Sequence, residues 1–285
     1  MSLPLSYAAL LVLSVAGADY PRADLLIEAP ALEKAGGKFV VLDARPRATY
    51  EAGHVPHAAW VDHAAWSKAF AAGQDPKEWE ARLGWLGVNA ETPVVVYDDG
   101  SVKDAARIWW ILRYWGVREA RLLDGGWHAW KESDGRVARG DTPPAPVAQA
   151  LKPQAGRLAT RQDVLADLKD HQAQIIDTRS QAEFCGEART AKRNGAIPGA
   201  KHLEWTDLLD PKTRKFEGPD ELRRLFREAG IDPSRPAVTY CQSGGRAAVM
   251  AFALELMGGK DVRNYYRSWA EWGNAADTPV EKPKQ

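Results

Sequence analysis

Val238-Thr-Tyr-Cys-Gln-Ser-Gly-Gly-Arg-Ala-Ala248 places a cysteine between a strand-like run and a helix. The residues before Cys241 are apolar and β-branched, whereas residues 247–257 are good helix formers that end at a pair of glycines. Gly244 and Gly245 let the intervening backbone curl so that several N–H groups can point inward. The positive end of the helix favours an anion at the same place. We therefore predict an anion-binding loop in which the Cys241 thiolate is a nucleophile.

The sequence around this loop has an earlier copy in the chain. In the first copy a predicted helix over 25–35 and a strand over 38–42 precede Asp43-Ala-Arg45, and in the second a helix over 160–169 and a strand over 173–176 precede Asp177-Thr-Arg179. Four further segments match: 53–58 with 195–200, 76–88 with 219–231, 92–97 with 235–240, and 127–130 with 269–272. Alternating strands and helices predict an α/β fold of two homologous domains, each a mostly parallel sheet flanked by helices.

The domain boundaries follow from composition. Residues 1–18 carry no charged side chain and end in a small-x-small pattern, so they resemble a secretory signal peptide. We assign 19–138 to the first domain, the proline-rich stretch 139–156 to a linker, and 157–285 to the second domain. If the leader is cleaved, the protein is exported to the periplasm or secreted; otherwise it is cytoplasmic. The leader is too short for a membrane span, so no stable membrane association is expected.

Charge and cysteine content exclude several classes of function. The 38 basic and 38 acidic side chains cancel, which gives no global basis for binding nucleic acid or an anionic membrane. Cys185 and Cys241 are the two cysteines of the chain, too few for a disulfide scaffold and without the spacing of a zinc site. No metal or other cofactor is expected. In an oxidising compartment, Cys185 could pair with Cys241 and inactivate the thiol, although a buried structural cysteine is the simpler interpretation.

The two copies differ at the position of the cysteine. After the matched tyrosine, the first copy has Asp98 and the second has Cys241, so the second domain carries the thiol chemistry and the first supports it. A nearby cation lowers a thiol pKa, and Arg246 and Arg179 are the first candidates. Arg179 could instead form a structural salt bridge with Asp177 or Glu183. The basic residues Arg189, Lys192 and Arg193 lie in an insertion that is either part of the site or a solvated loop.

Together, the Asp-x-Arg strand ends, the Gly-x-x-Pro-x-Ala turns, the loop from Cys241 to Arg246 and the Ser268-Trp-Ala-Glu-Trp-Gly273 segment resemble the tandem-domain rhodanese family. The resemblance covers nearly all of the chain after the leader. It implies a sulfurtransferase with an inactive first domain and a persulfide on Cys241. The partners implied are a small anionic sulfur donor and a cyanide or thiol acceptor. Arg246, Arg179, Gln242, Ser243, Gly244 and Gly245 are the predicted substrate-binding residues.

The identity of the donor depends on two departures from family patterns. Mercaptopyruvate enzymes of this family typically have a Cys-Gly-Ser/Thr-Gly-Val-Thr loop and an arginine before the aromatic residue that follows Asp-x-Arg. This chain has Cys-Gln-Ser-Gly-Gly-Arg, and Glu183 precedes Phe184. Thiosulfate is therefore the favoured donor and 3-mercaptopyruvate the alternative, although the loop also lacks the extra cations of the animal thiosulfate enzymes.

Two other classes of function remain open from the sequence. Related domains with a cysteine-based phosphate loop act as phosphatases or arsenate reductases, but those loops hold the arginine one position further from the cysteine than Arg246 is. A non-catalytic binding or sulfur-relay module would use the same fold. The intact Cys241 loop favours catalysis over such a module.

Overall fold

The first domain is built on a five-stranded parallel sheet in the order β1-β5-β4-β2-β3. A computed structural model describes residues 19–140 and 144–284, so the predicted leader lies outside the described residues. The strands are β1 (Leu26–Ile27), β2 (Val40–Asp43), β3 (Ala59–Trp60), β4 (Val94–Tyr97) and β5 (Ala120–Leu123). The helices are α1 (Ala29–Lys34), α2 (Arg47–Ala52), α3 (His63–Ala72), α4 (Pro76–Trp85), α5 (Lys103–Tyr114) and α6 (Gly126–Glu132), after a 3-10 turn η1 (Ala23–Leu25).

The second domain repeats this design on a four-stranded parallel sheet in the order β7-β6-β8-β9. Its strands are β6 (Gln174–Asp177), β7 (Lys201–His202), β8 (Ala237–Tyr240) and β9 (Val262–Asn264). Its helices are α7 (Arg161–Asp170), α8 (Gln181–Phe184), α9 (Pro219–Glu228), α10 (Gly245–Leu256) and α11 (Ser268–Trp272), with 3-10 turns η2 (Ala155–Arg157) and η3 (Trp205–Leu208). The predicted α/β architecture of two repeated domains is confirmed.

Most predicted elements near the repeats are observed within a few residues. Thr160 caps α7 through a reciprocal pair of hydrogen bonds with Asp163, as its position before the helix predicted. The predicted helix over 25–35 is wrong in its first half, where Leu26–Ile27 forms the edge strand β1 beside β5. Pro30 explains the difference, because proline is tolerated in the first turn of a helix but not further along it, so α1 begins at Ala29.

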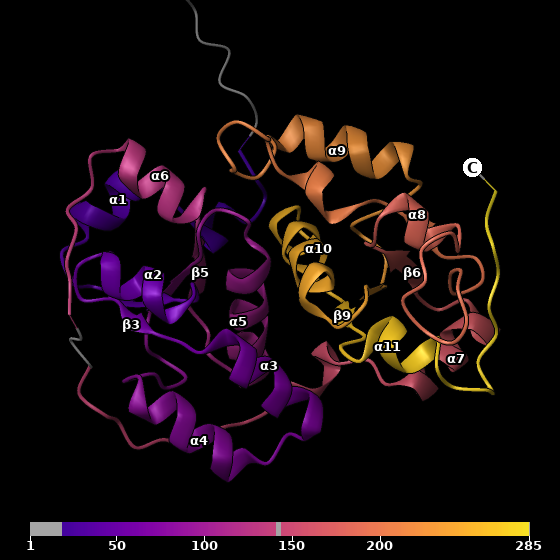
Figure 1. Cartoon of the computed structure of the whole chain (residues 1–285), viewed down its shortest axis with the longest axis horizontal. Coiled ribbons are helices and arrows are strands. Elements are labelled where there is room, and N and C mark those ends of the chain that lie inside the picture. Colours follow the sequence, from indigo (N-terminus) through magenta and orange to yellow (C-terminus); the bar gives the residue numbers. More distant parts are fainter. Residues whose placement is uncertain (1–18, 141–143, 285) are drawn as a thin grey trace, which may run out of the picture.

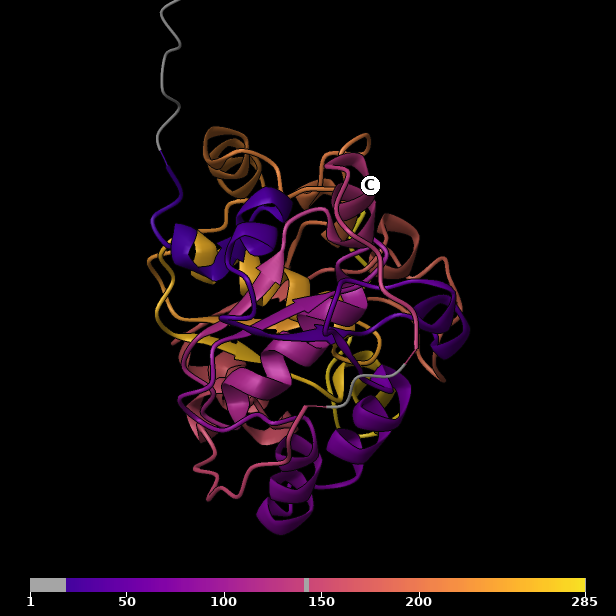
Figure 2. The ribbon, with the colours of Figure 1, turned by 90° about the vertical axis from the view of Figure 1, so that its left-hand side faces the viewer.

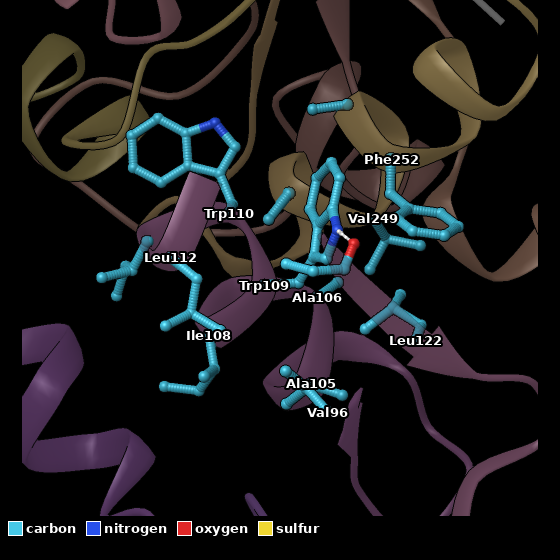
Figure 3. Packing of buried hydrophobic residues seen from close by; sticks show 14 of the residues in the cluster. Val96, Ala105, Ala106, Ile108, Trp109, Trp110, Leu112, Leu122, Val249 and Phe252 are labelled. Atoms are coloured by element: carbon cyan, nitrogen blue, oxygen red, sulfur yellow. Dashed lines mark hydrogen bonds between the residues drawn. The ribbon is translucent and has the colours of Figure 1, made fainter. Parts of the chain in front are cut away.

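Helices α5 and α10 pack against each other and hold the two domains together (Figure 1). Trp109 of α5 meets Phe252 of α10 edge to face, with ring centroids 4.8 Å apart. Figure 3 shows this contact with Val249 of α10 close by, while the Trp109 indole donates a 2.9 Å hydrogen bond to the Ala120 carbonyl. The buried cluster around these residues draws on both domains, so the domains share a core rather than meeting at a wet interface.

The linker follows the outside of the first domain, which faces the viewer in Figure 2. Between residue 144 and η2 the linker forms no regular element, but it is anchored by backbone hydrogen bonds. The Val147 N–H donates to Gly84 of α4, and the Gln154 N–H donates to Tyr114 of α5. These contacts tie the connection between the domains to the first of them.

A buried carboxylate at the domain interface makes stability depend on pH. Asp124 follows β5 and accepts a 3.0 Å hydrogen bond from the Phe216 N–H of the second domain. Burial raises the pKa of this carboxyl from 3.8 to about 6. The folded state therefore binds the proton more tightly than the unfolded chain, and stability falls as the pH rises from about 4 to about 6.

Replacing Asp124 with asparagine should remove this dependence, because the amide oxygen can still accept the Phe216 hydrogen bond without a charge. We expect Asp124→Asn to raise the free energy of unfolding above pH 6 by up to about 3 kcal/mol. Urea denaturation at several pH values measures the effect. Asp261→Asn, at an exposed aspartate, is the matched control. An unchanged pH profile in Asp124→Asn would show that the carboxyl does not carry the effect.

Candidate active site at the cysteine loop

Cys241 lies immediately after β8, at the carboxyl end of the central strands of its sheet. Only 1% of the residue is exposed. Its Sγ accepts hydrogen bonds from the Gly244 N–H at 3.1 Å and the Ser243 N–H at 3.4 Å. Helix α10 begins at Gly245 and directs its positive end at the same loop. The loop therefore directs two backbone N–H donors at the sulfur, an arrangement suited to negative charge there.

The two glycines of the loop serve different purposes. Gly244 precedes α10 with a φ of 84°, and a Cβ there would lie 2.8 Å from the Tyr266 ring and carbonyl, so both conformation and space require glycine. At Gly245 a Cβ would lie 2.4 Å from a guanidinium nitrogen of Arg107, a residue of the first domain. The second glycine thus allows the other domain to approach the loop closely.

Ser268 is a residue of the site that sequence reasoning missed. Its hydroxyl accepts a 3.0 Å hydrogen bond from the Cys241 N–H, donates to the Tyr265 carbonyl and lies 4.0 Å from the Cys241 Sγ. Its φ of 52° is uncommon for serine and indicates local strain. The matched position in the first domain is Gly126, with a φ of 55°. The sequence did contain a signal for Ser268: the first copy has glycine before the matched tryptophan Trp127, and the second has serine before Trp269.

Arg246 forms a two-pronged ion pair with Glu183 of α8, with nitrogen–oxygen distances of 2.6 and 2.9 Å. Burial would raise the pKa of the Glu183 carboxyl, but the guanidinium outweighs burial and lowers that pKa to about 2. Burial likewise opposes the charge of Arg246, yet its pKa is raised by Glu183 and by the nearby Cys241. Arg246 thus lies near the sulfur, with most of its charge compensated by a carboxylate.

The structure places Arg179 in the framework of the domain rather than among the groups that contact the sulfur. Its fully buried guanidinium pairs with Asp177 and donates to the Gly195 carbonyl, and it lies 4.4 Å from the Trp269 ring centroid. Arg45 in the first domain makes the same set of contacts with Asp43, Gly53 and Trp127, in a domain without a cysteine. The structural salt bridge is therefore the observed role of Arg179.

The remaining predicted residues divide between the loop and its surroundings. Ser243 is exposed, and Gln242 donates a 3.1 Å hydrogen bond to the Thr190 carbonyl, which ties the insertion to the loop. Within the insertion, Arg193 donates to backbone carbonyls near the C-terminus, including Trp272 at 2.9 Å, so it is structural. Arg189 and Lys192 are exposed. The basic cluster is thus a folded surface segment rather than a common binding site.

A cleft of about 710 Å³ opens at Ser243, between the two domains. The first domain contributes residues of α3 and of the start of α5, and the second contributes Ser243 and residues around the start of α11. Its basic side chains are Lys68, Lys103, Arg107 and Arg267, and its acidic side chains are Asp104 and Glu271; His63 also lines it. The excess of cations favours a small anion in the cleft.

In the first domain, the N–H groups of the equivalent loop bind a carboxylate of the protein itself. Asp98 follows β4 as Cys241 follows β8, and its buried carboxylate is surrounded by donors. These are the N–H groups of Gly100, Val102, Asp104 and Ala105 and the Ser101 hydroxyl. Burial raises the pKa of this carboxyl, and the backbone donors oppose the rise. The first loop therefore holds its own anion and is unavailable to a ligand.

The described residues form neither a metal-binding cluster nor a membrane-spanning helix. Within 19–140 and 144–284, no group of three or more His, Cys, Asp or Glu side chains is placed to hold a metal ion. Over the same ranges, no helix combines the length and the apolar composition needed to cross a bilayer.

Comparison with known proteins identifies the repeated unit. The family model described as "Rhodanese-like domain" matches residues 29–133 and again 160–275. The chain is 34% identical over 244 residues to 3-mercaptopyruvate sulfurtransferase of Escherichia coli strain K12, covering 82% of this chain and 85% of that protein. It is 34% identical over 275 residues to thiosulfate sulfurtransferase of Azotobacter vinelandii, covering 92% and 99%.

A solved structure supports the fold alone. The anaerobic ergothioneine biosynthesis enzyme of Chlorobium limicola, in complex with trimethyl histidine, superimposes with a TM-score of 0.86 at 22% identity. The match covers 93% of this chain and 72% of that one.

Proposed function

This chain belongs to the rhodanese family as a tandem of two rhodanese-like domains, and from that premise we propose that it is a sulfurtransferase that takes the outer sulfur of thiosulfate onto Cys241. The observation that carries the proposal is the Cys241 sulfur itself. It lies at the head of α10, accepts two backbone N–H groups, and belongs to a loop whose Ser243 lines a cleft rich in cations. These features suit a thiolate that must attack an anionic donor and then hold a charged persulfide.

The first half-reaction needs no cofactor. The Cys241 thiolate attacks the outer sulfur of thiosulfate and forms a new S–S bond. The S–S bond of thiosulfate breaks, and sulfite leaves with its electron pair. One negative charge stays on the enzyme persulfide, where the loop N–H groups can stabilise it. The cations of the cleft attract the dianionic donor against the charge of the thiolate.

The second half-reaction returns the enzyme to its starting state. Cyanide or a thiolate attacks the outer sulfur of the persulfide, and the sulfur–sulfur bond to Cys241 breaks. Thiocyanate or a new persulfide is released, and the Cys241 thiolate is regenerated. Because the sulfur is buried, the outer sulfur is the atom that an acceptor in the cleft can reach.

Glu183 favours thiosulfate over 3-mercaptopyruvate. A 2-keto acid donor requires a free cation for its carboxylate. At the position before Phe184, this chain has a carboxylate instead, and it occupies both arms of Arg246. The related sulfurtransferases divide between the two donors, so this ion pair is the feature of the chain that supports the choice.

The same ion pair argues against the phosphatase alternative. A phosphate loop needs an arginine whose guanidinium is free to bind a tetrahedral oxyanion. Arg246 is five positions after Cys241 and is committed to Glu183. A sulfur-relay module would pass through the same Cys241 persulfide to a protein acceptor, so it differs from the proposed enzyme only in its second step.

Mass spectrometry of the intact protein tests the donor. We expect incubation with thiosulfate to add the mass of one sulfur atom and to release one equivalent of sulfite, and cyanide should then reverse the gain. The same incubation with 3-mercaptopyruvate should load the protein more slowly, by about tenfold at equal concentration, since an unpaired carboxylate costs about 1–3 kcal/mol. Faster loading by 3-mercaptopyruvate would overturn the assignment of the donor, and no loading by either compound would overturn the proposed function.

A further inference from the structure

Arg107 of the first domain reaches across the interface to the back of the cysteine loop. One of its terminal nitrogens donates to the Ser243 carbonyl at 2.7 Å. The same nitrogen contacts the Ser67 hydroxyl at 2.7 Å and the Tyr266 hydroxyl at 3.0 Å. We propose that Arg107 is a positioning residue that orients and polarises the Ser243–Gly244 peptide, and so strengthens the hydrogen bond from Gly244 to the Cys241 sulfur.

The peptide bond provides the connection between cation and sulfur. Ser243 C=O and Gly244 N–H belong to one planar trans peptide, so they point in opposite directions. Arg107 binds the oxygen on one side, and the Cys241 Sγ accepts the N–H on the other at 3.1 Å. A cation at the oxygen draws electron density from the nitrogen and makes its N–H a stronger donor. It also fixes the plane of the peptide, and therefore the direction of the N–H.

The charge of Arg107 is available for this role. The residue is 8% exposed, and its hydrogen-bonding partners are two hydroxyls and the Ser243 carbonyl, all of them neutral. Among the described residues, no carboxylate lies within ion-pair distance of it, whereas Arg246 is paired with Glu183. In a poorly hydrated interface an uncompensated cation acts over a longer range than a paired one. Arg107 thus brings to the Ser243 carbonyl a cation that no carboxylate in the described part of the chain compensates.

The next peptide of the loop is held in a similar way from within the second domain. Asn264, at the end of β9, donates a 3.0 Å hydrogen bond to the Gly244 carbonyl. Two consecutive carbonyls of the loop therefore point away from the sulfur toward fixed donors. The N–H of the first of these two peptides, on Gly244, donates to the Cys241 Sγ.

The repeat supplies an internal comparison. Counted from the first residues of α5 and α10, Arg107 corresponds to Val249. By sheet register, Asn264 corresponds to Leu122. Both polar residues are thus replaced by apolar ones at the equivalent positions. The two donors occur at the loop that carries a cysteine and have no equivalents at the loop that carries Asp98.

Two substitutions separate charge from hydrogen bonding. Arg107→Gln keeps a donor for the Ser243 carbonyl but removes the charge, and Arg107→Lys keeps both. We expect Arg107→Gln to slow iodoacetamide alkylation of Cys241 about tenfold at neutral pH, because a weaker Gly244 N–H donor stabilises the reactive thiolate less, and Arg107→Lys to remain near the wild-type rate. The rate of each variant is followed across pH, and it should reach the same plateau at high pH.

The control removes another cation between the domains. Lys215 of the second domain pairs with Glu28 of the first at 2.6 Å, away from the loop. Lys215→Gln should leave the alkylation profile unchanged. The cleft residues His63, Asp104, Lys103 and Lys68 and the pair of Arg246 with Glu183 also face this region, and they are the same in every variant.

The outcome decides between positioning and simple packing. Equal profiles for Arg107→Gln, Arg107→Lys and the wild type would overturn the proposal. If Arg107→Gln does not fold, a wild-type profile in Arg107→Lys with an unshifted melting temperature supports the need for charge, and a profile shifted by tenfold overturns it. The inference concerns the persulfide chemistry proposed above, but alkylation needs no sulfur donor. The alkylation result can therefore be interpreted even if thiosulfate proves not to be the donor.

Discussion

Cys241→Ser should eliminate both the thiosulfate-dependent gain of one sulfur atom and the transfer of sulfur to cyanide. A serine hydroxyl in the same loop remains protonated at neutral pH and cannot form a persulfide. We therefore expect turnover to fall by at least about 10⁴-fold, the scale seen when a nucleophile is removed. The loop itself should persist, because its carbonyls and the Cys241 N–H are held by groups other than the sulfur.

Cys185 provides the matched control for this experiment. It is the other cysteine of the chain and is buried beside Phe184 and Ala196, where the Gln181 amide contacts its sulfur at 3.2 Å. Cys185→Ser should keep the sulfur gain and its reversal by cyanide. A sulfur adduct on Cys241→Ser that disappears in Cys185→Ser would move the nucleophile to the other cysteine. Peptide mapping of the adduct then locates the sulfur directly.

Arg246→Met is expected to have the second largest effect, because it leaves the buried Glu183 carboxylate without its cation. Breaking one side of a buried ion pair costs about 3 kcal/mol of stability. The residual negative charge of Glu183 should also disfavour the Cys241 thiolate. We expect persulfide formation from thiosulfate at neutral pH to slow by about 100-fold. Stopped-flow measurement of sulfite release gives the rate, and urea denaturation gives the stability.

Changes at Glu183 distinguish the two effects. Arg246→Met with Glu183→Met should recover much of the stability but not the rate. Glu183→Gln alone frees the charge of Arg246, so it should favour the Cys241 thiolate and speed loading of sulfur while it destabilises the fold. If the double variant also recovers the rate, then Arg246 serves the fold rather than the reaction.

The Glu183 pair also predicts how wild-type stability depends on acid. The pKa of its carboxyl in the folded state, about 2, lies below the ordinary value of 4.5. The contribution of the pair is therefore complete above about pH 4.5 and is lost as the pH falls toward 2. Glu183→Gln should remove this part of the acid sensitivity.

The central part of the fold was predictable because its signals are local. The apolar run before Cys241, the glycines after it and the helix formers beyond gave β8, the loop and α10 within two residues. Because the sequence is repeated, the sheet predicted for one domain also predicts the sheet of the other. β1 was not predictable in this way, since Leu26 and Ile27 form a strand only through pairing with β5, almost a hundred residues later.

The composition of the site was predictable only where it lies within the loop. Arg107 and Ser268 reach the loop from other parts of the chain; the sequence marks Ser268 only by its exchange for Gly126 in the first copy, and it does not mark Arg107. Arg179 shows the opposite failure. Its position after a strand suggested a ligand for substrate, but the same contacts at Arg45 show that the position belongs to the fold. The partner of Arg246 was equally hidden, because the sequence does not show that α8 lies beside α10.

The Asp98 loop of the first domain resembles the persulfide form of the Cys241 loop in the second. An aspartate carries Cβ, Cγ and a charged oxygen in the order in which a cysteine persulfide carries Cβ, Sγ and a charged outer sulfur. The N–H groups of Asp104 and Ala105 that bind the Asp98 oxygen correspond, by position in the helix, to those of Arg246 and Ala247. We expect these two amides to receive the outer sulfur. The first domain thus holds, in a carboxylate of its own, an analogue of the charged persulfide proposed for the second.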